Sequence, residues 1–217
     1  MFESFFPKPK QFFLSVLLWT AFGMLVWYGV GTQIGSMIGF DLQDAGEPVV
    51  GIAYFYTPSF LWFYVFYVVW VALFAAFWFL YHPHRWQMWS ILGSAFILFT
   101  TYYGVQVSVA INNWRRPFFD EFQQALSGDG SVTAGDLYEL IVIFAEIALV
   151  STVIYVVTRF FVSHYVFRWR TAMNDYYMSR WSTIRNIEGA SQRVQEDTMR
   201  FATIMEGLGV SVVDALM

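Results

Sequence analysis

The chain has 217 residues, of which 58% are hydrophobic, 22% are aromatic and 13% are charged. So small a charged fraction cannot cover the surface of a soluble domain of this length, so the composition excludes soluble globular proteins and indicates a bilayer protein. The absence of cysteine excludes disulfides, thiolate nucleophiles and thiolate metal sites. The net charge of −4 decides little, because in a membrane protein the positions of Lys and Arg carry more information than their sum.

Four apolar stretches are each long enough for the roughly 20 residues with which a helix crosses a bilayer. The predicted spans cover residues 12–30, 60–81, 86–111 and 137–162. The first is longer than the apolar region of a cleaved signal peptide and includes Trp19 and Trp27, so we interpret it as a retained span. Pro58 lies just before the second, where proline suits the start of a helix. The sequence therefore predicts an all-α polytopic membrane protein.

The distribution of basic residues predicts the side of the membrane that each loop faces, because cytoplasmic segments retain Lys and Arg. With a cytoplasmic N-terminus, ten of the twelve lie inside: Lys8, Lys10, Arg85 and the seven arginines from Arg159 to Arg200. Arg115 and Arg116 then lie outside. The loop of residues 32–57, which carries acids and no basic residue, also faces outward. We therefore expect a multi-pass protein with its N-terminus in the cytoplasm.

Beyond the fourth span the polarity changes without a Pro or Gly that would stop the helix. We therefore expect this helix to continue through residues 160–187 and to project into the cytoplasm. An aromatic stripe follows it at intervals of four residues: Tyr165, Trp169, Met173 and Tyr177. Such an apolar stripe on a polar helix requires a packing partner.

A turn at Glu188 and Gly189 leads into a second polar helix. Its charged residues have the spacings of helical ion pairs: Arg193, Glu196, Asp197 and Arg200. Residues 163–200 thus form a cytoplasmic reversal, and the apolar residues 201–217 are the start of a fifth span. We expect residues 1–217 to be a single transmembrane domain that is incomplete at its C-terminus.

Five strings of the sequence are long and specific. They are MFESFFPKPKQFFLS, HPHRWQMWSILGSA, SVAINNW, FFVSHYVFRWRTAMNDYYM and IEGASQRVQEDTMRFATIMEGLGV. Through these strings the chain strongly resembles the SbmA/BacA peptide antibiotic transporters of bacterial inner membranes. The resemblance covers the whole chain. The resemblance implies a homodimeric, proton-coupled importer of diverse peptides, including proline-rich antimicrobial peptides, peptide microcins and bleomycin-like compounds.

The resemblance also implies a membrane core similar to that of ABC exporters, but without an ATPase domain. The long helices of such a core reach into the cytoplasm and reverse there, which fits the cytoplasmic reversal. Members of the family continue beyond the position of Met217 with further spans. We therefore expect this chain to end inside its fifth membrane helix, as a truncated gene or a fragment, and to lack a complete translocation path by itself.

Proton coupling requires a group that alternates between charged and neutral, so acids near the membrane are the candidates. Glu206 lies about two turns past the last arginine and matches a glutamate in the family string, although a solvated acid at the headgroup level is the alternative. Asp214 lies eight residues on, or about 80° around the helix, so both acids could border one cavity.

Glu146 is the acid set most deeply in a predicted span. A charge at the bilayer centre costs at least about 2.5–3.5 kcal/mol, so we expect Glu146 to face protein or water. A local structural role is as compatible with this position as proton transfer.

The remaining polar groups have simpler explanations. Arg193, Glu196 and Asp197 match the family string QRVQEDT, but salt bridges within a cytoplasmic helix account for them. His82 and His84 flank Pro83 without a third ligand, which is weak evidence for a metal. We expect no metal, no cofactor, no enzymatic activity and no nucleic acid partner. The expected partners are peptides, protons, membrane lipids and a second copy of the chain.

Two other functions stay open. The chain could be the membrane half of an ATP-driven ABC transporter, in which case a Walker A string, GxxxxGK[ST], would follow downstream or on a partner chain. It could also be a membrane scaffold without transport, in which case neutralising every membrane acid would leave peptide uptake unchanged.

Overall fold

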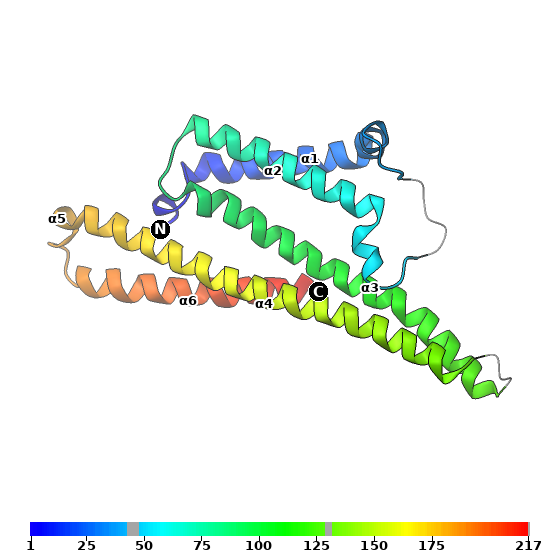
Figure 1. The fold of residues 1–217 in the computed structure, drawn as a ribbon. Helices are drawn as coiled ribbons and strands as arrows, with labels where there is room; N and C mark the ends of the chain where they lie inside the picture. Colours follow the sequence, from blue (N-terminus) through cyan, green and yellow to red (C-terminus); the bar gives the residue numbers. More distant parts are fainter. Residues whose placement is uncertain (43–47, 129–131, 217) are drawn as a thin grey trace. The chain divides into compact units, whose positions relative to one another are not determined.

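The computed structural model describes residues 1–42, 48–128 and 132–216, and for Arg193, Glu206 and residues 209–216 it describes the backbone alone. Within these ranges the chain is helical and has no strand, which confirms the predicted all-α class. The elements are η1 (Phe2–Ser4), α1 (Pro9–Met37), η2 (Ile52–Tyr56), α2 (Pro58–Tyr81), the π-helix η3 (Met88–Gly93), α3 (Ser94–Ser127), α4 (Ala134–Ser179), α5 (Trp181–Ile184) and α6 (Ala190–Leu216) (Figure 1).

In the described part of the chain, four helices are long and apolar enough to cross a membrane: α1, α2, α3 together with η3, and α4. Many of their apolar side chains are exposed, including Leu17, Leu25 and Leu80. Apolar surface in water costs about 25 cal/mol per Å², so helices of this kind require lipid around them. The prediction of a polytopic membrane protein is confirmed, and α2 begins at Pro58 as expected.

α1 and α3 extend past the ends of their predicted spans. α3 reaches Ser127 and passes through Pro117, whose missing N–H removes one helical hydrogen bond. Packing on both sides of the proline explains the extension. The rings of Trp114 and Phe118 stack at 4.7 Å, and the indole Nε1 of Trp114 donates a 2.7 Å hydrogen bond to the carbonyl of Leu140 on α4. The polar composition after residue 111 did not reveal these contacts.

α4 ends earlier than the sequence predicts. The helix expected over residues 160–187 stops at Ser179, because Arg180, with φ −107° and ψ 12°, leaves the helical conformation before the short α5. The hydroxyl of Ser179 donates a 2.8 Å hydrogen bond to the carbonyl of Tyr176, a local bond by which serine competes with helix formation. The predicted turn before α6 is confirmed, and Gly189 there has a φ of +74°, which a residue without Cβ adopts freely.

The chain forms two compact units, each of which has its own core. Unit 1 comprises Met1–Leu25, Val69–Thr101 and Val157–Leu216, and unit 2 comprises Val26–Val68 and Tyr102–Val156.

In unit 1 the aromatic stripe of α4 packs against the N-terminal segment, residues 1–7. The ring of Phe5 stacks on Trp169 at 5.3 Å and 12°, and meets Tyr165 edge-on at 5.2 Å. Trp169 also meets Phe201 of α6 at 5.0 Å. Phe5, Tyr165, Trp169 and Met173 are all buried. The partner that the stripe requires is therefore the N-terminal segment together with α6.

Unit 1 also holds a close approach of α1 to α2. The indole rings of Trp19 and Trp70 stack at 4.5 Å, and each ring donates its N–H to the backbone carbonyl of the other residue, at 3.2 and 3.3 Å. Gly23 permits this approach, because a Cβ atom there would lie 2.6 Å from Nε1 of Trp70. Indole N–H groups in a membrane find no water, so these reciprocal bonds satisfy both donors.

The core of unit 2 consists of Phe55, Phe60, Val107, Ala110 and Ile147. Polar side chains close to it are paired. The hydroxyl of Tyr54 donates a 2.8 Å hydrogen bond to Oε1 of Gln106, and the indole of Trp62 donates a 3.0 Å bond to the carbonyl of Gly31. Unit 2 thus follows the same rule as unit 1, in which aromatic residues supply both the packing and the polar links between helices.

Candidate functional site

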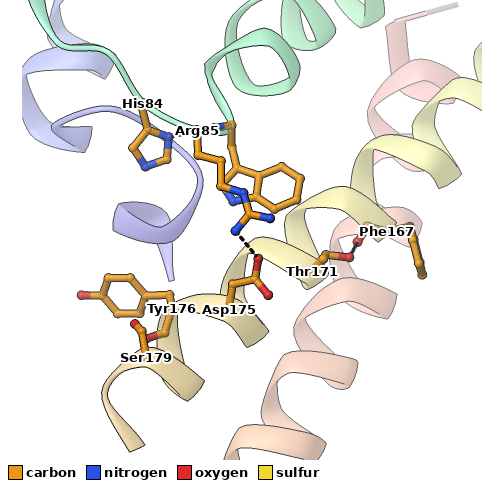
Figure 2. Close-up of polar contacts among 8 residues, drawn as sticks. His84, Arg85, Phe167, Thr171, Asp175, Tyr176 and Ser179 are labelled. Atoms are coloured by element: carbon orange, nitrogen blue, oxygen red, sulfur yellow. Dashed lines mark hydrogen bonds and ion pairs between the residues drawn. The ribbon is translucent and has the colours of Figure 1, made fainter.

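The polar surface of unit 1 brings together residues that are distant in the sequence. Arg85, in the turn before η3, extends to Asp175 on α4, with 3.0 Å between guanidinium nitrogen and carboxylate oxygen (Figure 2). The Arg85 guanidinium also lies over the ring of Trp86 at 5.3 Å. Both charged side chains are partly exposed, so this ion pair is a surface contact. It connects the α2–η3 turn to α4.

The next residue of α4 makes a second connection. The hydroxyl of Tyr176 donates a 2.9 Å hydrogen bond to the carboxylate of Glu3 in the N-terminal segment. The guanidinium of Arg180 lies 3.8 Å from the centre of the Tyr176 ring. Neighbouring residues of α4 thus hold two different segments by their polar groups, while the aromatic stripe holds the same region by packing.

His84 lies in the same turn as Arg85 and is half-buried. Its backbone N–H donates to Oε1 of Gln87 at 2.9 Å, and its Nδ1 accepts from the backbone N–H of Trp86 at 3.2 Å. Burial is the main cause that lowers the pKa of His84, and the nearby His82 lowers it further, while a hydrogen bond with the backbone of Glu3 opposes them. A neutral imidazole fits this geometry, because Nδ1 serves as an acceptor.

The predicted reversal, residues 163–200, contains one of the predicted helical ion pairs. Arg200 and Glu196 lie 2.7 Å apart at the i, i+4 spacing, and Gln192 donates a 3.3 Å hydrogen bond to the same carboxylate group. Asp197 is exposed to solvent. The side chain of Arg193 lies outside the described residues, so its predicted pairing stays a prediction.

The structure describes the side chain of only one of the three acids predicted for proton coupling. Glu206 and Asp214 belong to the backbone of α6, and their side chains lie outside the described residues. Glu146 is exposed on α4, where it has no hydrogen bond or ion pair with any described residue. Its neighbours one turn away, Val142 and Leu149, are also exposed, at 57% and 66%. Glu146 is therefore an acid on an otherwise apolar helix face.

Sequence reasoning missed the contacts of Arg85 and Asp175, although one signal was available. Asp175 is the single acid between Phe160 and Ile187, and Arg85 is the single basic residue between the second and third spans. Each lies in a segment predicted to be cytoplasmic. Two lone opposite charges on the same side of a membrane are candidates for a pair, but no spacing rule joins them across the sequence.

The comparison with known proteins concerns the same elements. Residues 83–217 match the SbmA/BacA-like family, whose members are peptide transporters. The matched range begins in the turn that holds His84 and Arg85, includes α3, α4 and α6, and covers more than half of the chain. The strings that the sequence analysis singled out after residue 82 lie within it. The chain therefore belongs to the SbmA/BacA-like family.

Proposed function

We propose that the chain is the N-terminal part of a homodimeric importer that carries peptides across the bacterial inner membrane together with protons. The observation that carries this proposal is the family match over η3, α3, α4 and α6, because the family transports peptides. The proton is the proposed energy source, and antimicrobial peptides and peptide antibiotics are the proposed substrates.

The surroundings of Glu146 support a pathway or a partner at α4. Among exposed Val142 and Leu149, this acid would face lipid in an isolated chain, at a cost of at least about 2.5–3.5 kcal/mol if charged. A water-filled cavity or a second copy of the chain against this face of α4 removes that cost. Both belong to a dimeric transporter with a polar pathway.

In the proposed cycle an outward-open cavity takes up peptide and proton together. Protonation of an acid on α6, Glu206 first and Asp214 second, neutralises the charge and permits reorientation toward the cytoplasm. A negative interior favours cationic peptides by about 2.3 kcal/mol per charge per 100 mV. Acids along the pathway therefore suit both the proton and the peptide.

The proposal is tested by uptake into vesicles that contain the complete gene product. A fluorescent cationic peptide is added under an imposed pH gradient with no ATP present. We expect accumulation that stops when a protonophore collapses the gradient. Uptake that requires ATP and ignores the gradient would assign the chain to an ABC-type transporter. If uptake equals that of empty vesicles, both transport functions are rejected and a membrane scaffold without transport is favoured.

The proposed orientation has its own test. We expect an impermeant thiol reagent added to intact cells to label a cysteine at Pro48, in the outward loop, and to spare cysteines at Lys10 and Glu188. All three positions are exposed in the fold, so burial does not decide the labelling. The reverse pattern would place the N-terminus outside and overturn every side assignment.

A further inference from the structure

A groove of 580 Å³ lies between α4 and α6 in unit 1. Its volume falls within the range of small-ligand sites, about 300–1,000 Å³. The lining residues are Phe167, Arg170, Thr171, Asn174, Met178, Trp181, Ser191, Val194, Gln195 and Thr198. Figure 2 shows Phe167 and Thr171 on the face of α4 that borders the groove. None of these residues was predicted to act together.

Four polar side chains of the groove have no protein partner within the part of the chain that the structure describes, and all four are exposed to solvent. Arg170 and Asn174 lie one turn apart on α4, and Ser191 and Gln195 lie one turn apart on α6. The hydroxyls of the two groove threonines, in contrast, each donate to a carbonyl of their own helix.

Three pairs of polar groups lie just outside the groove. Asp175 holds Arg85, Tyr176 holds Glu3, and Glu196 holds Arg200. The groove thus gathers exposed donors and acceptors from two helices in one concave site. A ligand in this site can contact several of them at once.

The open groups define the chemistry of that ligand. A guanidinium such as that of Arg170 binds a carboxylate through two parallel hydrogen bonds. The amides of Asn174 and Gln195 each offer a donor and an acceptor, which is also what a peptide bond requires. Trp181, with Phe167 and Met178, provides apolar surface for a side chain. A ligand with one carboxylate, peptide bonds and an apolar side chain satisfies all of them.

Other ligand classes fit less well. None of the described residues that line the groove is acidic, so a metal ion or a polyamine finds no counter-charge among them. A lipid headgroup is also disfavoured by position. Arg170 lies eight residues beyond the end of the predicted fourth span at residue 162, or about 12 Å further along the helix. The headgroup layer is only about 5–8 Å thick on each side.

We infer that the groove between α4 and α6 binds the C-terminal segment of a peptide, with the terminal carboxylate on Arg170 and the preceding peptide bonds on Asn174 and Gln195. This inference rests on the proposed function. It adds to that function a peptide site on the cytoplasmic side. A peptide that has crossed the membrane would be held there by its carboxyl end before release.

The test uses the protein in lipid nanodiscs and two fluorescein-labelled peptides, Gly-Ser-Ala-Phe-Leu with a free carboxylate and the same peptide with a C-terminal amide. Fluorescence anisotropy measures binding. We expect the free acid to bind at least about tenfold more tightly, because a hydrogen-bonded charge pair is lost in the amide. Equal binding of the two peptides would overturn the inference.

Matched variants locate the site. Arg170→Gln should reduce binding of the free acid to the level of the amide, whereas Arg185→Gln, at an exposed arginine outside the groove, should not. Asn174→Ala should weaken binding of both peptides, and Asn186→Ala should weaken neither. Arg170 and Arg185 variants that behave alike would overturn the assignment. If Arg170→Gln instead changed the mass of the assembly in solution, a second copy would occupy the groove and the inference would be wrong.

Binding in nanodiscs and uptake into vesicles together separate this inference from the proposed function. Acid-specific binding at Arg170 without gradient-driven uptake by the wild-type protein would reject proton-driven transport and retain the groove site. Gradient-driven uptake with no preference for the free acid would retain transport and reject the groove site.

Discussion

The ion pair of Arg85 and Asp175, 3.0 Å long, joins the turn before η3 to α4, and it is the most direct charged contact between these two segments. The two side chains are 75% and 39% exposed, so water and salt screen the interaction. A surface pair of this kind contributes roughly 0.2–1 kcal/mol.

We therefore expect Asp175→Asn to lower the free energy of unfolding by that amount at low salt and by less in 1 M salt. Denaturation in detergent at both salt concentrations measures the change. The exchange of both charges, Arg85→Asp with Asp175→Arg, should recover part of the loss. Asp120→Asn is the control, because Asp120 lies 3.7 Å from Arg116 within one exposed helix. An equal effect at Asp120 would show that the inter-segment geometry is unimportant.

The close approach of α1 and α2 at Trp70 predicts opposite effects for two glycines of α1. Gly23→Ala would place a Cβ 2.6 Å from the Trp70 indole, which stacking on Trp19 holds in place, so we expect a loss of about 1–3 kcal/mol through overpacking. Gly29 has nothing within 4 Å of the same added atom, so Gly29→Ala should be neutral or stabilising. Melting temperatures in detergent measure both, and equal shifts would contradict the described packing.

Phe5 is predicted to contribute strongly to the stability of unit 1. Its ring is fully buried and contacts both Trp169 and Tyr165. Phe5→Ala should cost about 3–5 kcal/mol, because it removes the ring and leaves a cavity. Leu17→Ala is the control, since Leu17 is 68% exposed on α1. Chemical denaturation should separate the two variants clearly, and a small effect at Phe5 would mean that the N-terminal segment is not docked in solution.

His84 predicts a pH dependence of stability. Burial lowers its pKa in the folded state, whereas the unfolded chain titrates near the ordinary value of about 6.5. As pH falls through about 6.5, the unfolded state binds the proton first, so the free energy of unfolding decreases; above that pH the stabilisation is fully present.

We expect His84→Asn to flatten the stability profile between pH 7.5 and 5.5, because asparagine can accept the bond from the Trp86 N–H but cannot titrate. Melting temperatures across this range provide the measurement. His164, which is exposed on α4, serves as the control, and His164→Asn should leave the slope unchanged. An unchanged slope in the His84 variant would assign the acid sensitivity to another group.

Glu206→Gln should reduce gradient-driven uptake on the order of tenfold or more, without loss of membrane insertion or dimer formation. Glutamine keeps the size and hydrogen bonding of the acid but cannot exchange a proton. Glu188→Gln is the control, because Glu188 lies at the exposed turn before α6, where neutralisation should change little. If the Glu206 variant took up peptide at the wild-type rate and with the same pH dependence, Glu206 would be a structural acid. Asp214 would then be tested next.

Local signals in the sequence predicted much of this fold. Pro58 marks the start of α2, Gly189 marks the turn before α6, and the four-residue spacing of Glu196 and Arg200 predicts their ion pair. Each depends on residues within one or two turns, where helix geometry determines which groups meet. The apolar lengths of the four membrane helices belong to the same class of signal.

Contacts between distant segments were harder to predict. The aromatic stripe on α4 indicated that a partner was needed, but it could not indicate that Phe5 would be that partner. α3 continues through Pro117, where Trp114 is bonded to α4, and α4 stops at Ser179, where Arg180 leaves the helical conformation. The groove around Arg170 depends on two helices that turn at α5, so no single stretch of sequence displays it.

The docking of Phe5 on Trp169 also sets an order of events during synthesis. A ribosome adds about 5–20 residues per second, so the N-terminal segment is made roughly 10 to 30 s before its partner on α4 exists. During that interval Phe5 lacks its stacking partner Trp169, whereas Phe6 can already pack on Phe12 and Phe13 of α1. The docking of the first residues on α4 is therefore a late step in the assembly of unit 1.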